Sequence, residues 1–513
     1  MRNILNINPV GRINRVGLPN RISNDEVLKR ENFYVVGTGD EKRNRKIPGS
    51  SRHTTAASGT SYTSIYRYYT RKESRKTFAF NNGRIYHISD NGSSTVLDPI
   101  FSPVAIPSLE LIRVSNADVL YFSEGIDTGL YSHDGNIGNS WNKETNVSLN
   151  MVGMLSHLDR LWGFEEDSED LNFSKNLDPT NFTDSTDAGT ITIGPRRGSK
   201  IMQIVILYGT IYIFKQDSIW RLTGRSPSEF IVEEVNPFLG CAARGSVRNT
   251  DNGVIFLGSD YEFYFFGGTI ASTIMLTSKL AFGGDLTKNL LPLLNREKLS
   301  NIVSIFHNKI YRCSYVENGG TTNNMEYCFN TLNETDFLTR GFNISSYCKW
   351  DKIPDKNELL TGRTDMGHIM RHYEGLNIDN GATNPSMKFS LQTKYLGSEE
   401  PRNIRFKRIF FNMGVLGAEP LTARYYLDCR NSVSDAGIDE WPIRGEYKTV
   451  AGFKISSQDA ITSRVNLDYG KSKGQNISVE INHEGKDIDV EVQNIQIEVV
   501  AKPTRKFSEK VAA

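Results

Sequence analysis

The residues of this sequence that could do chemistry are, first, an acidic run and, second, a pair of histidines. The acidic run extends from Glu165 to Asp170, with the letters EEDSED, and such carboxylates are the ligands that a hard cation prefers. The run lacks the glycine at the turn position and the regular ligand spacing of a calcium loop. The pattern therefore favours a solvated loop over a cation site.

The two histidines, His368 and His372, have the spacing HxxxH but lack the glutamate of a zinc-protease helix. They also fall where the surrounding pattern predicts a strand. The five cysteines stand far apart without a CxxC pair, which is typical of reduced core residues: Cys241, Cys313, Cys328, Cys348 and Cys429. We therefore predict no metal and no other cofactor.

Nucleophile and phosphate motifs are missing from the sequence, which contains no GxSxG, no P-loop and no GxGxxG. No pair of carboxylates stands out among many equivalent loop acids. The segment Ser132 to Gly135 resembles the Asp-box turn of sialidases, but its glycine comes one residue early, and such boxes are structural turns. The sequence therefore predicts a protein that is not an enzyme.

Charge and hydropathy exclude two further classes of function. The 513 residues include 60 basic and 59 acidic side chains, so the formal charge of +1 gives no global attraction to DNA or to an anionic membrane. The most apolar run, Ile201 to Phe214, is too short to span a bilayer and contains Gln203 and Gly209. We expect no secretory signal at the N-terminus and no membrane insertion.

Two basic clusters are the candidate contact sites of the sequence. The first lies between Gly39 and Lys46, and the second is the turn Pro195 to Gly198. Guanidinium groups can bridge two carboxylates of a neighbouring subunit, while solvated loops are the alternative for both clusters. The candidate assembly or channel contacts are Arg43, Arg45, Lys46, Arg196 and Arg197.

The stretch from His157 to Gly224 predicts the elements that position these residues. Two turns, Leu158-Asp159 and Gly209-Thr210, each lead into a short apolar strand, Arg160 to Phe164 and Ile211 to Phe214. Each of these is followed by a polar turn and a strand that alternates apolar and polar residues, Leu171 to Ser174 and Ile219 to Leu222. The stretch therefore predicts antiparallel meanders.

Similar units recur along the chain with aromatic residues at matching places, at intervals of roughly 35 to 55 residues. Because one small meander cannot bury both faces, radial stacking is the economical arrangement. The sequence thus predicts an all-β protein with a seven-bladed β-propeller. Blade-to-blade packing is the expected role of the aromatic residues, against a minor alternative of ligand stacking, and Trp220 is expected in the core.

The changes in pattern along the chain predict four segments. Residues 1–62 form an extended arm with one or two strands, such as Asn32 to Val36. Residues 63–383 form the propeller, residues 384–502 a C-terminal antiparallel β-sandwich of longer alternating strands, and residues 503–513 a tail. Few stretches have a helical pattern, and Lys288 to Leu299 has the best one.

The segment "DRLWGFEEDSEDLNFSKNLDPTNFTD…ITIGPRRGSKIMQIVILYGTIYIFKQDSIWRLTG" resembles the core of tail hub or nozzle proteins of short-tailed bacteriophages, also called packaged-DNA stabilisation proteins. Three features carry the resemblance: the turn Asp178 to Phe182, the strand Ile191 to Gly194 and the hairpin Tyr212 to Gly224. The hairpin at Gly83 to Tyr86 and the segment Lys394 to Arg408 also match, so that the resemblance covers about residues 60–410.

The resemblance implies a structural protein of the virion tail, assembled in the host cytoplasm. About six copies of the propeller would form a ring below the portal and adaptor, line part of the channel through which double-stranded DNA leaves, retain packaged DNA and anchor tail fibres or spikes. A near-neutral chain suits such a conduit, because tight phosphate binding would hinder ejection. A carbohydrate-binding or receptor-binding propeller and a propeller glycosidase are the alternatives.

Overall fold

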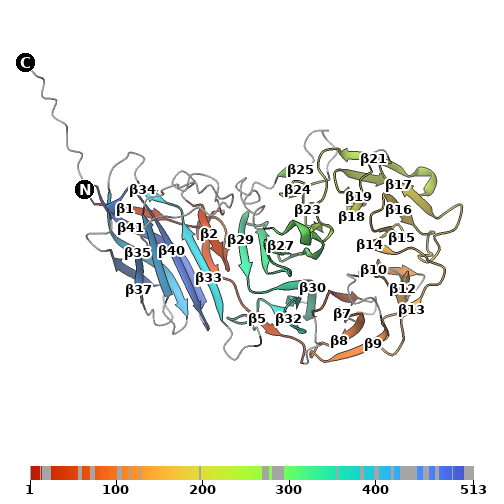
Figure 1. Cartoon of the computed structure of the whole chain (residues 1–513), viewed down its shortest axis with the longest axis horizontal. Coiled ribbons are helices and arrows are strands. Elements are labelled where there is room, and N and C mark those ends of the chain that lie inside the picture. The colour runs from red at the N-terminus through yellow and green to blue at the C-terminus, as the bar shows by residue number, and fades with distance from the viewer. Residues whose placement is uncertain are drawn as a thin grey trace, which may run out of the picture. The chain divides into compact units, whose positions relative to one another are not determined.

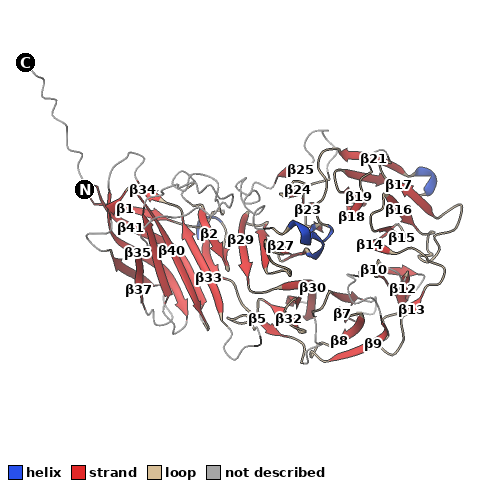
Figure 2. Ribbon diagram, in the orientation of Figure 1, coloured by secondary structure: helices blue, strands red, loops and turns tan. Residues whose placement is uncertain are grey.

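A computed structural model describes most of the chain, and its elements are strands and a few short 3-10 helices (Figures 1 and 2). The described residues are 2–11, 13, 23, 25–55, 61–69, 75–100, 107–114, 117–125, 129–195, 198–268, 277–279, 294–353, 356–379, 381, 386–397, 404–416, 421–427, 448–453, 461–467, 473–487 and 489–501. The protein is therefore all-β, as predicted.

The chain folds into two compact units whose boundaries differ from the predicted ones. The larger unit contains Ser50–Cys328 and Gly341–Gly375, and the smaller unit contains Met1–Gly49, Phe329–Arg340 and Leu376–Ala513. The predicted propeller of residues 63–383 thus begins thirteen residues earlier, at Ser50, and gives up a piece near its end. Neither unit is a single continuous stretch of sequence, because the chain passes from one to the other four times.

Six four-stranded sheets make up most of the larger unit (Figure 1). Their strands, in spatial order, are β6 (Ser64–Tyr69), β7 (Arg75–Asn81), β8 (Arg84–Ile88) and β9 (Ser94–Ile100); β10 (Ser108–Val114), β11 (Ala117–Ser123), β12 (Leu130–His133) and β13 (Asn142–Lys143); β14 (Met151–His157), β15 (Arg160–Glu165), β16 (Asp170–Phe173) and β17 (Gly189–Thr192); β18 (Ile201–Leu207), β19 (Thr210–Lys215), β20 (Ile219–Thr223) and β21 (Ile231–Asn236); β22 (Arg248–Asn249), β23 (Val254–Leu257), β24 (Phe263–Phe266) and β25 (Thr277–Lys279); and β30 (Ile344–Ile353), β31 (Lys356–Arg363), β32 (Ile369–His372) and β5 (Ser50–Arg52).

A further meander of this unit consists of β26 (Val303–His307), β27 (Ile310–Tyr315) and β28 (Met325–Asn330). The short 3-10 helices lie in the connections: η2 (Pro227–Glu229), η3 (Arg244–Ser246) and η4 (Arg296–Asn301). The predicted helix from Lys288 to Leu299 falls mostly outside the described residues, and its described end contains only the first part of η4.

Apolar side chains on neighbouring sheets share their cores, which explains why the small sheets stack. The aromatic residues predicted to pack between units do so: Trp162 of β15 is 1% exposed and lies in one cluster with Ile204 and Ile213 of the next sheet. Tyr212 and Phe256 join the following pair of sheets in the same way. A meander with two apolar faces can bury both only between two neighbours, and the result is a propeller-like succession of small antiparallel sheets.

Trp220 departs from its predicted place in the core. It is only half-buried at the edge of the cluster that contains Trp162, and its indole Nε1 donates to Ser218 Oγ at 3.0 Å. Strand β20 is third in its sheet, between β19 and the edge strand β21, so that Trp220 packs against the cluster without being enclosed by it.

The strand predicted from Asn32 to Val36 is confirmed as β3 (Phe33–Val36), but the described N-terminal residues form further strands of the two units and no extended arm of residues 1–62. Strand β5 is the fourth strand of a sheet in the larger unit, where Ser50 pairs with His372 and Arg52 with Met370. The pairing joins residues more than three hundred positions apart, and so supplies the backbone partners that a free arm would lack.

The preceding residues are strands of the smaller unit. This unit has two sheets, one with β29 (Thr335–Arg340), β2 (Val27–Glu31), β33 (Met387–Thr393), β40 (Asn476–Gly485), β36 (Leu421–Leu427), β37 (Lys448–Phe453) and β34 (Leu396–Gly397), the other with β3 (Phe33–Val36), β4 (Arg43–Lys46), β41 (Asp489–Ala501), β35 (Ile404–Leu416), β38 (Ile461–Asn466), β1 (Arg2–Ile7) and β39 (Lys473–Gly474). The helix η1 (Gly39–Glu41) connects β3 to β4. The rings of Phe33 and Phe389, from the two sheets, meet edge to face at 5.1 Å.

Candidate functional site

Two of the predicted contact residues, Arg43 and Arg45, form ion pairs within the chain. They project from β4 toward acids of the adjacent strand β41, Arg43 to Glu491 at 3.0 Å and Arg45 to Asp489 at 2.8 Å. Hydrogen bonding to Asp489 raises the pKa of Arg45. Since about half of each arginine side chain stays exposed, the contact with a neighbour predicted for them remains a prediction.

Lys46 does not fit the prediction of an assembly contact. In β4 the side chains alternate between solvent and core, which turns Asn44 and Lys46 inward. The Lys46 ammonium donates to the Leu376 carbonyl oxygen at 2.5 Å, and burial lowers its pKa to about 8. A lysine that is 2% exposed cannot meet another subunit without a local opening of the strand. The other two candidates, Arg196 and Arg197, lie outside the described residues.

The acidic run after β15 is held by internal contacts, in keeping with its predicted loop character. Asp167 pairs with Lys200 at 2.5 Å and Glu166 with Arg244 at 2.5 Å. His368 and His372 are likewise separated in role: His368 contacts Thr54, while the His372 ring packs against Phe342 with centroids 4.4 Å apart. In the described part of the chain, no three His, Cys, Asp or Glu side chains are grouped as metal ligands. Four of the cysteines are buried free thiols, and Cys429 lies outside the described residues.

The site that the structure does present is a pocket between two neighbouring sheets of the larger unit, which the sequence did not predict. Two hairpin turns and one loop border it: the β14–β15 turn, the β18–β19 turn and the segment from Gly224 to Phe230 before β21. The pocket has a volume of about 460 Å³. The apolar part of its lining is Leu158, Trp162, Ile211, Leu222 and Phe230.

The two turns at the pocket have an unusual backbone for their residues. Leu158 and Asp159 have φ of 50° and 56°, and Tyr208 and Gly209 have φ of 51° and 75°. Two-residue hairpin turns with positive φ at both positions favour Asn and Gly, because a larger side chain is strained there. The predicted turn at Gly209-Thr210 is thus shifted by one residue, since Thr210 already belongs to β19.

Both strained turn residues are also exposed and apolar in character. Leu158 is 37% exposed, and Tyr208 is 69% exposed although its hydroxyl donates to the Asn252 carbonyl oxygen at 2.9 Å. Leu177, which lies beside the first turn through the hydrogen bond from its N–H to the Asp159 carbonyl oxygen, is 59% exposed. Leu158 at the pocket, together with Tyr208 and Leu177 near it along the turns, therefore presents exposed apolar surface on a backbone conformation that local preferences do not explain.

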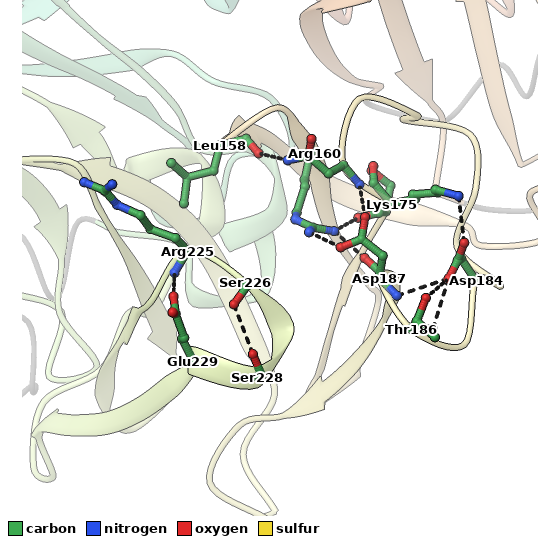
Figure 3. Close-up of polar contacts among 12 residues, drawn as sticks. Leu158, Arg160, Lys175, Asp184, Thr186, Asp187, Arg225, Ser226, Ser228 and Glu229 are labelled. Carbon is green, nitrogen blue, oxygen red and sulfur yellow. Dashed lines mark hydrogen bonds and ion pairs between the residues drawn. The ribbon is translucent and has the colours of Figure 1, made fainter.

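The polar groups at the pocket come mainly from the loop after β20. The backbone N–H of Arg225 donates to Glu229 at 3.4 Å, which closes the loop around the pocket (Figure 3). The Arg225 guanidinium forms no ion pair with any described residue in the structure, and it points away from Glu229 in Figure 3. Burial lowers the pKa of His157 below its usual value. The pocket thus combines apolar walls with one available guanidinium.

A network of internal ion pairs fixes the neighbouring turn behind Leu158 (Figure 3). Arg160, which is buried, pairs with Asp187 and also donates to the Ser174 carbonyl oxygen at 2.8 Å. Lys175 pairs with Asp184 at 2.8 Å, and these partners hold the pKa of both aspartates below the usual value. These contacts therefore link the β14–β15 turn region of the pocket to the loop that contains Asp184 and Asp187.

Comparisons with known proteins identify no family for this chain. No family model matches the chain, and no curated protein matches it either. Among solved structures, a streptogramin B lyase is 10% identical with a TM-score of 0.41, covering 63% of this chain and 96% of the lyase. A virginiamycin B lyase from Staphylococcus aureus is 12% identical with a TM-score of 0.38, covering 63% and 97%.

The extracellular domain of a putative hybrid two-component system from B. thetaiotaomicron has a TM-score of 0.43 at 12% identity, over 70% of this chain and 42% of that one. All three TM-scores are below 0.5, and at such low identity these likenesses say nothing of activity. Among the described residues, no helix is long and apolar enough to cross a lipid bilayer.

Proposed function

We propose that this protein is a structural component of the tail of a short-tailed bacteriophage, in which a ring of about six copies forms a nozzle or hub. In that role it would sit below the portal and adaptor, retain packaged DNA, line part of the exit channel for double-stranded DNA and anchor fibres or spikes. The proposal rests on the resemblance of the segment His157 to Gly224, together with the way this segment folds.

One observation carries the proposal. The segment supplies strands β15–β17 and β18–β20 of two consecutive sheets, whose turns carry exposed apolar side chains beside a pocket. Exposed apolar surface rimmed by polar residues marks places where proteins meet. A scaffold whose rigid turns present such a surface suits a subunit that makes many contacts in an assembly.

The finer architecture belongs to the same proposal. The larger unit would be a seven-bladed propeller, supported by the six four-stranded sheets and the meander β26–β28. The strand β5 would then close the ring of blades, because it pairs the N-terminal end of the unit with its last sheet. The smaller unit would be a sandwich, supported by the contact of Phe33 and Phe389 across its two sheets.

We also propose that the protein is not an enzyme. Acids within the segment His157 to Gly224, such as Glu166, Asp167 and Asp187, are held in ion pairs with basic side chains. Glu110, whose pKa burial raises to about 7, lies outside this segment and accepts a hydrogen bond from the Ser156 N–H at 3.0 Å. A general acid or base needs an environment that moves its pKa toward neutrality, whereas the pairs with Arg160 and Lys200 lower the pKa of Asp187 and Asp167. Incubation with capsular polysaccharide or lipopolysaccharide should release no reducing ends.

A carbohydrate-binding or receptor-binding propeller is the second candidate, and the lining of the pocket is the observation that favours it. Phe230 offers an aromatic face beside Arg225, Glu229 and Thr223, whose polar groups suit hydroxyl ligands. The site differs from a dedicated saccharide site in the exposed Leu158 at its rim, because a leucine side chain cannot form a hydrogen bond with a hydroxyl group.

Isolated virions separate the two candidates. An antibody against the protein should label the tail, and negative-stain images of purified tails should show a ring of defined copy number. If the protein is absent from purified virions and the monomer binds defined glycans on an array, the tail proposal is wrong and the second candidate takes its place.

A further inference from the structure

We propose that neighbouring copies of this chain join by a knob-into-hole contact, in which Phe238 of one copy enters the pocket beside Leu158 of the next. The inference rests on the proposed ring, because it identifies the two surfaces that would link its subunits. Both surfaces belong to the larger unit, and both are present in a single copy of the chain.

The knob is the most exposed large apolar side chain in the described residues. Phe238 is 90% exposed and follows the end of β21. Its N–H donates to Asn236 Oδ1 at 2.9 Å, and the N–H of Leu239 donates to the same oxygen at 3.1 Å. Pro237 further restricts the turn, and Leu239 anchors it by packing on the adjacent core. A rigid aromatic side chain loses little conformational freedom on binding, which is the property of an interface anchor.

The hole is the pocket between the two strained turns. Its volume of about 460 Å³ lies within the range of pockets that hold small ligands, so it has room for a phenyl ring and the turn that carries it. Phe230 and Leu158 supply apolar contacts for the ring, and the exposed Tyr208 extends the surface. The Arg225 guanidinium can donate hydrogen bonds to backbone carbonyl oxygens of the turn that carries Phe238. The aromatic ring alone could not pair these oxygens when they leave water.

Knob and hole lie at opposite ends of one strand, so a copy cannot fill its own pocket. Phe230 of the pocket directly precedes β21, and Phe238 follows it. Thr223 pairs with Ile231 at the pocket end, while Ile219 pairs with Asn236 at the other. A six-residue strand extends for roughly 20 Å. The contact must therefore run head to tail from copy to copy, and such heterologous contacts produce a ring when the rotation closes.

The strain at the turns is consistent with this use. In the corresponding turn between β26 and β27, the first position is Asn308, with φ of 50°. The same backbone conformation is therefore formed there with a polar residue. Leu158 has the same φ in its turn and is exposed in addition. A side chain that costs stability in the free protein can be retained where it contacts a partner.

Photo-crosslinking tests the contact directly, even where the association is weak. The full chain is produced with p-benzoylphenylalanine in place of Phe238, irradiated over a concentration series and resolved on a denaturing gel. We expect a product with the mass of two chains, whose crosslinked peptides contain Leu158 or the segment 223–230. Irradiation of the same protein with benzoylphenylalanine at Leu332, an exposed leucine of the smaller unit, should not label these peptides.

Complementary variants test the direction of the contact. Phe238→Ala removes the knob and keeps the hole, whereas Leu158→Asn removes the apolar rim and keeps the knob; Thr223→Trp, which fills the hole, serves as the second hole variant. Sedimentation velocity should show each variant losing at least tenfold in self-association relative to wild type. An equal mixture of Phe238→Ala and a hole variant should form a dimer and nothing larger, because only one of the two possible contacts is intact.

Two results would overturn the inference: a crosslink from position 238 to any other surface or to none at the highest concentration, and self-association of Phe238→Ala equal to that of wild type. Neither result bears on the presence of the protein in virion tails, which the antibody experiment measures. Conversely, a positive crosslink with no protein in virions would leave the knob-into-hole contact standing and remove the proposed tail role.

Discussion

Two kinds of hairpin turn occur in the larger unit, and they differ in their first residue. At Asn82 and Asn308 the left-handed backbone is occupied by asparagine, the residue that tolerates it, whereas at the pocket it is occupied by Leu158 and Tyr208. All four turns join antiparallel strands by two residues. The same two-residue turn is thus formed with asparagine at its first position elsewhere in the unit. The backbone of the hairpin therefore does not require leucine or tyrosine at the pocket turns.

The difference shows that the residue preferred by the backbone of a turn and the residue that gives the turn an apolar surface can be different ones, even within one repeated fold. Around Asn308 the turn is tied to the preceding sheet, β22–β25, by an ion pair of Lys309 with Asp251 at 2.9 Å. Around Tyr208 the equivalent tie is the hydroxyl bond to Asn252, and the ring itself remains exposed. Four measurements bear on the comparison. Three concern the larger unit, namely the packing of Trp162, the pH dependence of stability at His372 and the exchange of the turn residues, and the fourth concerns Arg45 of the smaller unit.

The largest expected effect is at the floor of the pocket. Trp162→Ala should lower the free energy of unfolding by about 3–5 kcal/mol, because the indole is 1% exposed and its loss leaves a cavity under Leu158. Trp220→Ala, at the half-buried tryptophan of the same cluster, is the control and should cost clearly less. Urea denaturation measures both. Equal losses would show that the floor of the pocket is no better packed than its edge.

Acidification should weaken the part of the unit that contains the asparagine turn at Asn308. Burial, and then Arg312, His307 and Arg363, hold the pKa of His372 well below 6.5, so the folded protein keeps this ring neutral while the unfolded chain takes up a proton. The stabilising effect is present above pH 6.5 and is lost as the pH falls below it, by about 1.4 kcal/mol per pH unit for one proton. Urea midpoints at pH 7.5 and 5.5 measure this, and His372→Asn should show a flatter dependence. An unchanged dependence in the variant would mean that other groups determine it.

Exchange of the turn residues is expected to have smaller effects of opposite sign. Leu158→Asn should raise the free energy of unfolding by about 1 kcal/mol, because asparagine tolerates positive φ. The matched control Asn308→Leu should lower it by about the same amount. Melting temperatures of the two variants against wild type measure the pair. If Leu158→Asn is destabilised, the leucine packs within its own chain and is not strained for the sake of a partner.

The smallest effect is expected at the predicted basic cluster in the smaller unit. Arg45→Ala should change the free energy of unfolding by less than about 1 kcal/mol, because the pair with Asp489 is half-exposed and screened by solvent. Raising the salt concentration should reduce the difference further. A loss well above this value would place Arg45 among the structural residues, together with Lys46.

Local pattern was sufficient for the central strands. The predicted strands Arg160 to Phe164 and Ile219 to Leu222 are confirmed as β15 and β20 with an extra residue at the end. Their alternation and their bounding turns act within a few residues, so each strand is readable without its neighbours. The position of the second turn was wrong by one residue because tyrosine at positive φ contradicts the preference on which such a prediction depends.

The N-terminal segment and the pocket needed the folded chain. The letters of β4, RNRK, indicate a charged loop, yet the strand turns Lys46 inward because the Leu376 carbonyl oxygen lies next to it. The pocket brings together Leu158, Thr210 and Phe230, which share no motif. The only signal in the sequence was the apolar Leu158 in the predicted turn Leu158-Asp159. This signal indicates a site only once the structure shows that the turn borders a pocket.

The sequence by itself determined that this protein is all-β, that its middle consists of small meanders and that aromatic residues pack between them, because alternation, turns and apolar anchors act over short distances. Only the tertiary structure decided which segments complete each sheet. The pairing of Ser50 with His372 and the placement of residues 1–49 with the C-terminal strands depend on contacts between distant residues, whose backbone hydrogen bonds carry no mark in the local sequence.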